Sequence, residues 1–229
     1  IPQLMQCSAR SAGDGSEHVV ITLPNGQEVS SRDANVDDLL STTFGRPVLL
    51  QSLPTDGSTE HFESGVPDNP DMMTEIREIM GRDEDEPLPD FAVFPPVIFD
   101  FATPPGTHYD CWPLLVMSTS ALEAMQKAVP DSVVDILRFR PSIMIDTPDE
   151  VGHPEFSWKG RKGQLGSAVI EFLDPCPRCV MITRQVTDDI PADRAILRHV
   201  IRDLNQAAGI YASIVTPGKV SVGDTLTFL

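Results

Sequence analysis

The sequence has few cysteines and few basic residues. Its 229 residues contain four cysteines at irregular spacing, which is not the pattern of a secreted domain held together by disulfides. Lysine and arginine total 17 against 34 acidic residues, a formal net charge of −17. A chain of this charge has no electrostatic footprint for nucleic acid and is repelled by anionic membranes. We therefore expect neither DNA, RNA nor a membrane surface as partner.

Long apolar runs are also missing. No segment approaches the roughly 20 apolar residues that cross a bilayer, and the first ten residues, IPQLMQCSAR, lack the pattern of a signal peptide. The chain is nevertheless long enough, and at 41% hydrophobic residues apolar enough, to bury a core. We expect a cytoplasmic protein in a reducing compartment. The chain begins at Ile1 without an initiator Met, which leaves open a segment upstream.

The first two parts of the chain differ in composition. Residues 1–53 alternate apolar runs with turns, which predicts a hairpin around PNG, a helix over VDDLLSTTF and a strand over PVLLQSL, as part of a β-rich N-terminal region. Residues 54–103 are rich in proline, glycine and acid, and include the run DEDE. We interpret them as an acidic connector or insertion, partly disordered, with one helix near PDMMTEIREIM that ends at Gly81.

Residues 104–229 carry dense structural signals. Strands are predicted at WPLLVM, LRFRPSIMID, SAVIEFL and CVMITR, and a helix at TSALEAMQKAV. A second helix is predicted over residues 191–208, with Pro191 at its start and Gly209 after its end. Many short strands with Gly/Pro turns and few helices indicate a mainly β fold, a β-barrel with a few peripheral α-helices.

The stretch DPCPRCV places Cys176 and Cys179 three residues apart. A structural zinc site needs four ligands, and the sequence has no second C-x-x-C and no nearby histidine pair. A thioredoxin-type dithiol opens a helix, whereas this pair lies between two β-rich runs. The remaining interpretations are packing, or a thiolate that the cation of Arg178 favours and that binds a soft or high-valent transition metal.

Four segments together resemble a known family. TPPGTHYDCWPLLVMSTSALEAM, LRFRPSIMID, WKGRKGQLGSAVIEFLDPCPRCVMIT and YASIVTPGKVSVGDTLTFL, in this order and spacing, are similar to the MOSC domain. This is the C-terminal domain of molybdenum cofactor sulfurases, and it also occurs in the mitochondrial amidoxime reducing component and in free-standing bacterial proteins. The resemblance covers about residues 104–229. The stretches IPQLMQCSAR and VVITLPNG are similar to part of the family's β-rich N-terminal region, so residues 1–53 are expected to be part of the MOSC N-terminal region. The family's β-barrel with a few helices agrees with the fold predicted above.

The resemblance implies a site for the molybdenum cofactor (molybdopterin). Cys179 corresponds to the cysteine that ligates molybdenum, or that carries sulfur in the sulfurases, and is the expected catalytic residue. Ser142 stands where relatives usually have Asn, Ala121 where they have Ser, and the family's basic segment for the pterin phosphate is not visible before Ile1. The expected cofactor-binding residues are Cys179, Arg140, Ser142, Ser118, Arg138 and Arg178.

Three functions follow from the resemblance. The first is a molybdenum-dependent oxidoreductase that reduces N-hydroxylated or N-oxide small molecules. Its electrons would come from a separate donor protein, because the sequence has no flavin, haem or Rossmann glycine motif. The second is a sulfur carrier with a persulfide on Cys179. The third is a degenerate, non-enzymatic MOSC binding module, which Ser142 and Ala121 suggest.

Overall fold

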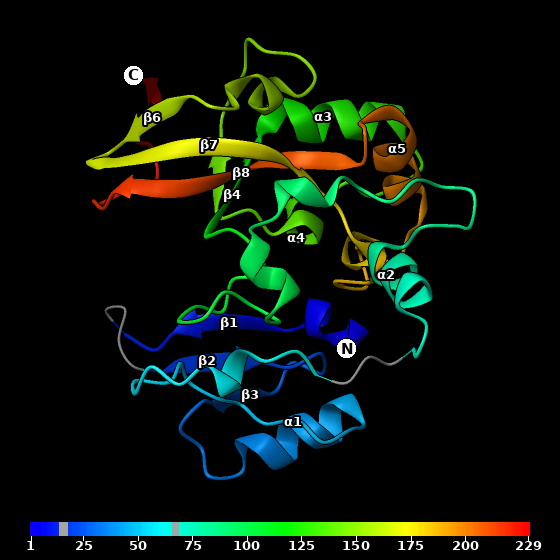
Figure 1. Ribbon diagram of the computed structural model, residues 1–229, viewed down its shortest axis with the longest axis vertical. Helices are drawn as coiled ribbons and strands as arrows, with labels where there is room; N and C mark the ends of the chain where they lie inside the picture. The colour runs from blue at the N-terminus through cyan, green and yellow to red at the C-terminus, as the bar shows by residue number, and fades with distance from the viewer. Residues whose placement is uncertain (14–17, 66–68) are drawn as a thin grey trace. The chain divides into compact units, whose positions relative to one another are not determined.

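The computed structural model describes residues 1–13, 18–65 and 69–229 (Figure 1). By its internal contacts the chain divides into two compact units. The first comprises residues 1–53 and 184–193, and the second residues 54–183 and 194–229. Each unit has its own apolar core, so each is considered by itself.

The first unit is a small antiparallel sheet with one helix. Strands β1 (Ser8–Ser11), β2 (Val19–Thr22) and β3 (Glu28–Ser30) pair in sequence order, and helix α1 (Val36–Phe44) follows. Its core is formed by Leu23, Val29, Val36 and Leu40. The predicted hairpin and helix are both present.

The strand predicted at PVLLQSL does not form. Side chains of α1 take the backbone partners that a strand would need: the Val48 N–H donates to Ser41 Oγ (3.0 Å), and the Leu50 N–H donates to Asp37 Oδ1 (2.8 Å). Side-chain oxygens of this kind compete with a sheet ladder for the backbone. The segment therefore stays irregular despite its apolar composition.

The second unit is built on a six-stranded sheet. Its strands are β4 (Leu114–Ser118), β5 (Ile143–Ile145), β6 (Lys162–Leu165), β7 (Ala168–Pro177), β8 (Ala207–Thr216) and β9 (Thr227–Phe228), in the order β5-β4-β8-β7-β6-β9. Only β4 and β5 are parallel. The long strands β7 and β8 run beside each other (Figure 1), and their register shifts at three irregularities, which bend the strands.

The mainly β prediction is thus confirmed, but the described residues form a curled half-barrel and not a closed barrel. The strands at the two ends of the sheet, β5 and β9, do not pair with each other in the described part of the chain. Both are short, with three and two residues. They are too short to close the sheet by a continuous ladder.

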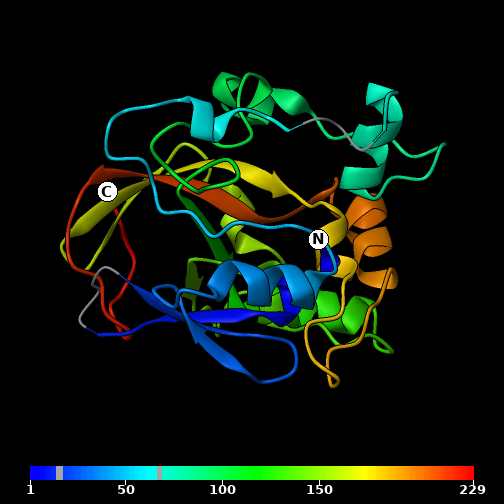
Figure 2. The same cartoon turned by 90° about the horizontal axis from the view of Figure 1, so that it is seen from below.

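Four helices accompany this sheet: α2 (Met72–Met80), α3 (Thr119–Ala128), α4 (Ile136–Phe139) and α5 (Ala195–Asp203). Helices α3 and α5 share a core with the sheet, which includes Met117, Met125, Ile196, Val200 and Ala208. Both ribbon views place α2 beside α5 (Figures 1 and 2). None of the described helices is both long and apolar enough to cross a membrane.

Three sequence predictions for this unit need correction. The first part of LRFRPSIMID is helix α4, and CVMITR forms a 3-10 turn at Val180–Thr183, so neither is a strand there. The helix predicted over residues 191–208 is only α5. Gly209 lies within β8 with φ +77°, where a Cβ would come within 2.7 Å of the Met117 side chain. Glycine is needed at this position for close strand packing, so it does not mark the helix end.

Candidate functional site

The thiol turn, residues 176–179, lies at one edge of the six-stranded sheet. Strand β7 ends at Pro177, which pairs with Ala207 at the start of β8. On the other side of β8, Val116 pairs with Ile210, and β4 ends two residues later at Ser118. The sheet register therefore brings the ends of β4 and β7 to the same edge, with β8 between them.

Cys176 is buried in the protein interior. It packs in a cluster with Cys111 and Tyr211. Burial raises the pKa of Cys176, although the charge of Arg178 opposes this, and burial together with the charge of Asp110 raises the pKa of Cys111 to about 12. Burial also raises the pKa of Tyr211. These groups are neutral at physiological pH, and such buried thiols are typically inert.

Cys179 is placed differently. It follows the last residue of β7 by two positions and is half-buried, and all four cysteines are free thiols. Two buried guanidinium groups, those of Arg178 and Arg82, interact electrostatically with it. Cys179 thus lies close to two positively charged side chains and is still partly accessible to solvent.

The guanidinium of Arg178 points into the protein. Its Nη1 donates to Cys176 Sγ (3.2 Å), and its Nη2 donates to the carbonyl of Phe139 (2.9 Å). Its Cζ lies 5.5 Å from the centroid of the Phe139 ring. The whole residue is only 8% exposed. Arg178 therefore ties the turn to the end of α4.

Arg138 has a similar buried position. It is 1% exposed, its Nε donates to the carbonyl of Val133 (2.8 Å), and its Nη1 donates to the carbonyl of Ile182 (3.3 Å). The second bond joins α4 to the 3-10 turn that follows Cys179. Both arginines thus bring α4 and the thiol turn together.

Arg140 is exposed and stands at the C-terminus of α4. Its backbone is left-handed (φ +53°, ψ +49°), a conformation uncommon for a residue with a side chain. Its guanidinium has no hydrogen-bond or ion-pair partner in residues 1–13, 18–65 or 69–229. Strained backbone of this kind is often found at functional sites. The geometry leaves its five donors available for a ligand.

Ser118 is fully buried at the start of α3. Its Oγ accepts a hydrogen bond from the Ala121 N–H (3.1 Å) and donates to Glu155 Oε2 (2.5 Å). The other carboxylate oxygen of Glu155 is buried without a hydrogen-bond partner among the described residues, and the nearest cationic candidate, His153 Nδ1, is 3.7 Å away. A buried carboxylate oxygen that accepts no hydrogen bond is costly, which makes Glu155 a functional candidate. Within HPEFSW nothing marks it in the sequence.

Ser142 lies apart from the thiol turn. Its Oγ accepts from the Leu115 N–H (3.3 Å), and its own N–H donates to the Leu115 carbonyl (2.8 Å). It lines a cavity of about 550 Å³ between β5, β7, β8 and the segment 217–224. None of the other expected site residues lines this cavity. The structure therefore brings Arg138, Arg178 and Cys179 together and puts Ser118 at the same sheet edge, but it gives Ser142 other neighbours.

Within the described ranges no group of three or more His, Cys, Asp or Glu residues could hold a metal ion. Cys179 could thus contribute one ligand only. A metal bound there would take its other ligands from a cofactor or from solvent.

The six-stranded sheet and the helices packed on it define a mainly β protein, in which Cys179 is the partly accessible cysteine of the thiol turn. Residues 104–227, more than half of the chain, match the family model of the MOSC domain, and the chain belongs to the MOSC domain family. This membership makes it a molybdenum-cofactor-related MOSC protein. A search of curated proteins found no match.

Two solved structures are similar over about half of each chain. One is YiiM from Escherichia coli, with 16% sequence identity, 52% of this chain and 54% of that chain covered, and a TM-score of 0.38. The other is described as a hypothetical protein, with 15% identity, 51% of each chain covered and a TM-score of 0.38. The chain thus spans about half the length of either structure.

Proposed function

We propose that the chain binds the molybdenum cofactor with the Cys179 thiolate as protein ligand, and that it reduces N-hydroxylated or N-oxide small molecules. One observation carries the proposal. Of the two thiols in the turn, Cys176 is buried, packs in the core and accepts a hydrogen bond from Arg178. Cys179 is accessible and lies near two guanidinium groups. A thiolate so placed suits a soft or high-valent metal.

The residues present fit this cofactor in two ways. Cys179 would supply the metal ligand. Arg140, exposed and without a partner in the described chain, would offer its planar guanidinium to oxo or pterin acceptors. Arg138, Arg178 and Ser118 are buried and bonded within the protein. We assign them the role of holding α4, the thiol turn and the start of α3 in place.

The proposed reaction balances with two electrons and two protons. When bound, the cofactor supplies the two-electron exchange that breaks the N–O bond of the substrate. The oxygen leaves as water. The nitrogen of an N-hydroxylated substrate gains one of the two protons in place of the hydroxyl group, whereas with an N-oxide both protons enter the water and the nitrogen gains none. The electrons come from a separate donor protein. The part of Cys179 left exposed gives a small substrate access to the reacting centre.

Elemental analysis tests this proposal. Wild type, Cys179→Ala and Cys176→Ala are made in a host that synthesises the cofactor, and molybdenum and oxidised pterin are measured per chain. We expect near-stoichiometric metal in the wild type, background levels in Cys179→Ala, and retention in the matched control Cys176→Ala. The loaded wild type should then reduce an aromatic amidoxime with a chemical electron donor. Wild type without molybdenum above the Cys179→Ala level would refute the proposal.

A second candidate function rests on the same accessible thiol. A sulfur carrier needs a free, accessible cysteine to hold a persulfide, and the half-buried Cys179 with its cationic neighbours meets this requirement. Incubation with a cysteine desulfurase should then leave cyanide-labile sulfur on the wild type and none on Cys179→Ala. Molybdenum-free protein with labile sulfur would favour the carrier. Protein with neither would favour a binding module.

A further inference from the structure

The segment that follows α2 reaches the thiol turn from the acidic part of the chain. Helix α2 ends at Gly81, which has a left-handed backbone, and Arg82 follows with only 6% exposure. Arg82 Nη1 and Nη2 both donate to the carbonyl of Arg178 (3.2 Å each), and Nε donates to Gln206 Oε1 (3.0 Å). Arg82 Nη1 also bonds the Met80 carbonyl. One buried side chain thus links α2, the thiol turn and the start of β8.

Gly81 packs directly against the residue that follows Cys179. A Cβ on Gly81 would lie 3.1 Å from Val180 Cβ and 2.8 Å from Leu197 Cδ2. No side chain fits between α2 and these neighbours, and the positive φ of +64° independently favours glycine. The contact is therefore a close backbone approach, and Arg82 makes its bonds from this fixed position.

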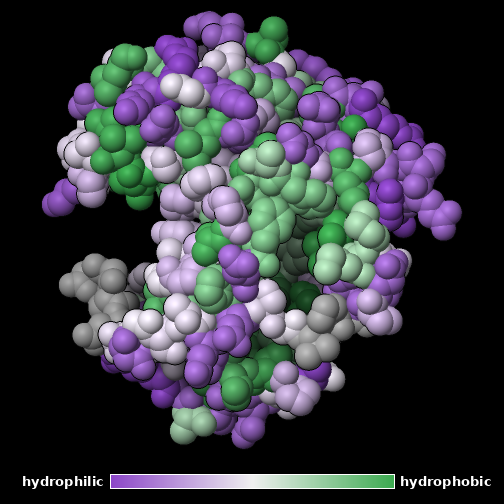
Figure 3. Space-filling view, in the orientation of Figure 1, coloured by the Kyte–Doolittle hydropathy of each residue, from purple (hydrophilic) through white to green (hydrophobic). Residues whose placement is uncertain are grey.

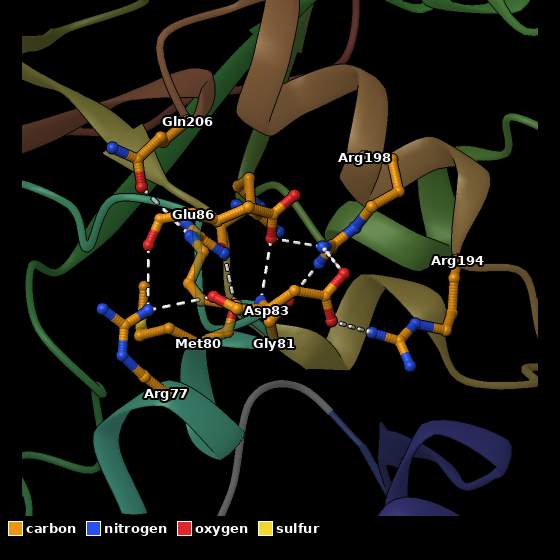
Figure 4. A network of polar contacts seen from close by, with 10 residues as sticks. Arg77, Met80, Gly81, Asp83, Glu86, Arg194, Arg198 and Gln206 are labelled. Carbon is orange, nitrogen blue, oxygen red and sulfur yellow. Dashed lines mark hydrogen bonds and ion pairs between the residues drawn. The ribbon is translucent and has the colours of Figure 1, made fainter. Parts of the chain in front are cut away.

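Acidic residues of the following loop fasten it to α5 (Figure 4). Arg198 pairs with Asp83 (2.7 Å) and with Glu86, and it bonds the Gly81 carbonyl. Arg77 Nη1 donates to the carbonyls of Asp83 (3.0 Å) and Glu86 (2.8 Å). On the face in Figure 3 the surface over this loop is hydrophilic. Part of the acidic run thus closes a defined loop, residues 80–86, which we name the α2 cap.

We propose that the α2 cap positions the thiol turn, and that Arg82 is the positioning residue for Cys179. The backbone of Arg178 is held on both sides, since its N–H donates to the Gln206 carbonyl (2.9 Å) and its carbonyl accepts from Arg82. The peptide group that leads into Cys179 is thereby fixed while the thiol stays accessible. The metal-binding consequence rests on the proposed function; the positioning itself does not.

The charge state of Arg82 agrees with this role. Burial, together with the positive charge of Arg198, lowers the pKa of Arg82 to about 10, and the charge of Glu86 opposes this lowering. Arg82 is thus still cationic at neutral pH, and its bonds to carbonyl oxygens are charge-assisted. Hydrogen bonds of this type are stronger than neutral ones, so their loss should destabilise the thiol turn.

Hydrogen exchange of the full-length chain without cofactor tests the positioning. In Arg82→Met we expect the amides of residues 178–183 to exchange about tenfold faster than in the wild type, because the Arg178 carbonyl loses its charged donor. Exchange in α3 and β4 should stay unchanged. Arg82→Lys keeps the charge but cannot reach both acceptors, so it should restore part of the protection. Arg194→Gln is the matched control, since it removes an exposed arginine that contacts the cap at Asp83.

The outcomes separate this proposal from the proposed function. Folded Arg82→Met with wild-type exchange in residues 178–183 overturns the positioning, even if the wild type binds molybdenum. Faster exchange there with no molybdenum in the wild type keeps the positioning and removes the metal role. If both hold, Arg82→Met should lose molybdenum about tenfold faster on dilution than Arg194→Gln. If Arg82→Met does not fold, Gly81→Ala displaces the cap without removing charge and should loosen the same amides.

Discussion

Two helices reach the thiol turn from different parts of the chain, and both end in a left-handed residue. Helix α4 ends at Arg140, and its Phe139 carbonyl accepts from the Arg178 side chain. Helix α2 ends at Gly81, and Arg82 behind it donates to the Arg178 backbone carbonyl. Arg178 is therefore held by its side chain from one helix and by its backbone from the other. The two helix ends divide the task of fixing one residue.

The arginines at these two helix ends also differ in whether their guanidinium N–H groups are already hydrogen-bonded to the protein. Arg138 and Arg82 are buried, and they donate to carbonyl groups of the protein. Arg140 is exposed, with no hydrogen-bond or ion-pair partner in the part of the chain that the structure describes. An arginine whose donors are already used organises the site, and one whose donors are available can bind a ligand. Burial and bonding, and not proximity to the cysteine, separate the two roles.

The largest effect on stability should come from Arg138→Met in α4, compared with Arg140→Met at the residue that follows this helix. Arg138→Met leaves the buried Ile182 carbonyl without its donor and should lower the free energy of unfolding by about 2–3 kcal/mol. Arg140→Met should change it by less than about 0.5 kcal/mol, because the side chain is exposed. Urea unfolding followed by the fluorescence of the two tryptophans, Trp112 and Trp158, measures both.

The two variants should rank in the opposite order when the loss of bound molybdenum is measured in place of the loss of stability. Arg140→Met should reduce molybdenum bound per chain, whereas folded Arg138→Met should retain more of it. Equal stability of the two variants would contradict the division between buried and exposed arginines. A large destabilisation by Arg140→Met would show that its left-handed backbone is held by unrecognised contacts.

An effect of intermediate size is expected at high pH, where the buried thiols should lower the free energy of unfolding of the second unit. The pKa of Cys111 rises on folding from 9.0 to about 12, so the unfolded chain ionises first as pH increases. The folded state then binds more protons than the unfolded state, and stability is lost from about pH 9 up to about pH 12. Between pH 8 and pH 10 the wild type should lose about 1 kcal/mol more than Cys111→Val. Urea unfolding at the two pH values measures this difference.

Cys111→Ser provides the control for the alkaline loss, because it keeps a small polar group that does not titrate in this range. It should follow Cys111→Val in its pH dependence, whatever its stability at pH 8. If wild type and both variants lose the same stability between pH 8 and pH 10, Cys111 is not protected from ionisation by the fold. The contrast between the buried thiols and Cys179 would then rest on their accessibility alone.

Local patterns predicted most elements and failed where side chains or close packing decide. The helices α1, α2 and α3 and the hairpin follow from caps, turns and periodicity, as the structure confirms. LRFRP and CVMITR have strand composition, but Asp135 caps the short helix α4, and the 3-10 turn after Cys179 packs against α2 and α5. The turn DPCPRCV identified the thiols. Neither composition nor spacing could show that Arg82, about a hundred residues earlier, lies beneath them.

The smallest effect should come from Arg194, which joins the α2 cap at its exposed side. Its guanidinium is 3.1 Å from Asp83 Oδ1, but the two side chains are 69% and 55% exposed, so water competes for both partners. Arg194→Gln should therefore change the free energy of unfolding by less than about 0.5 kcal/mol, and added salt should reduce even this. A loss above about 1 kcal/mol in urea unfolding would show that the exposed pair helps to hold the cap. The fixed position of Arg82 would then depend on this exposed ion pair as well as on the partly buried bonds of Arg198 and the contact of Gly81 with Val180.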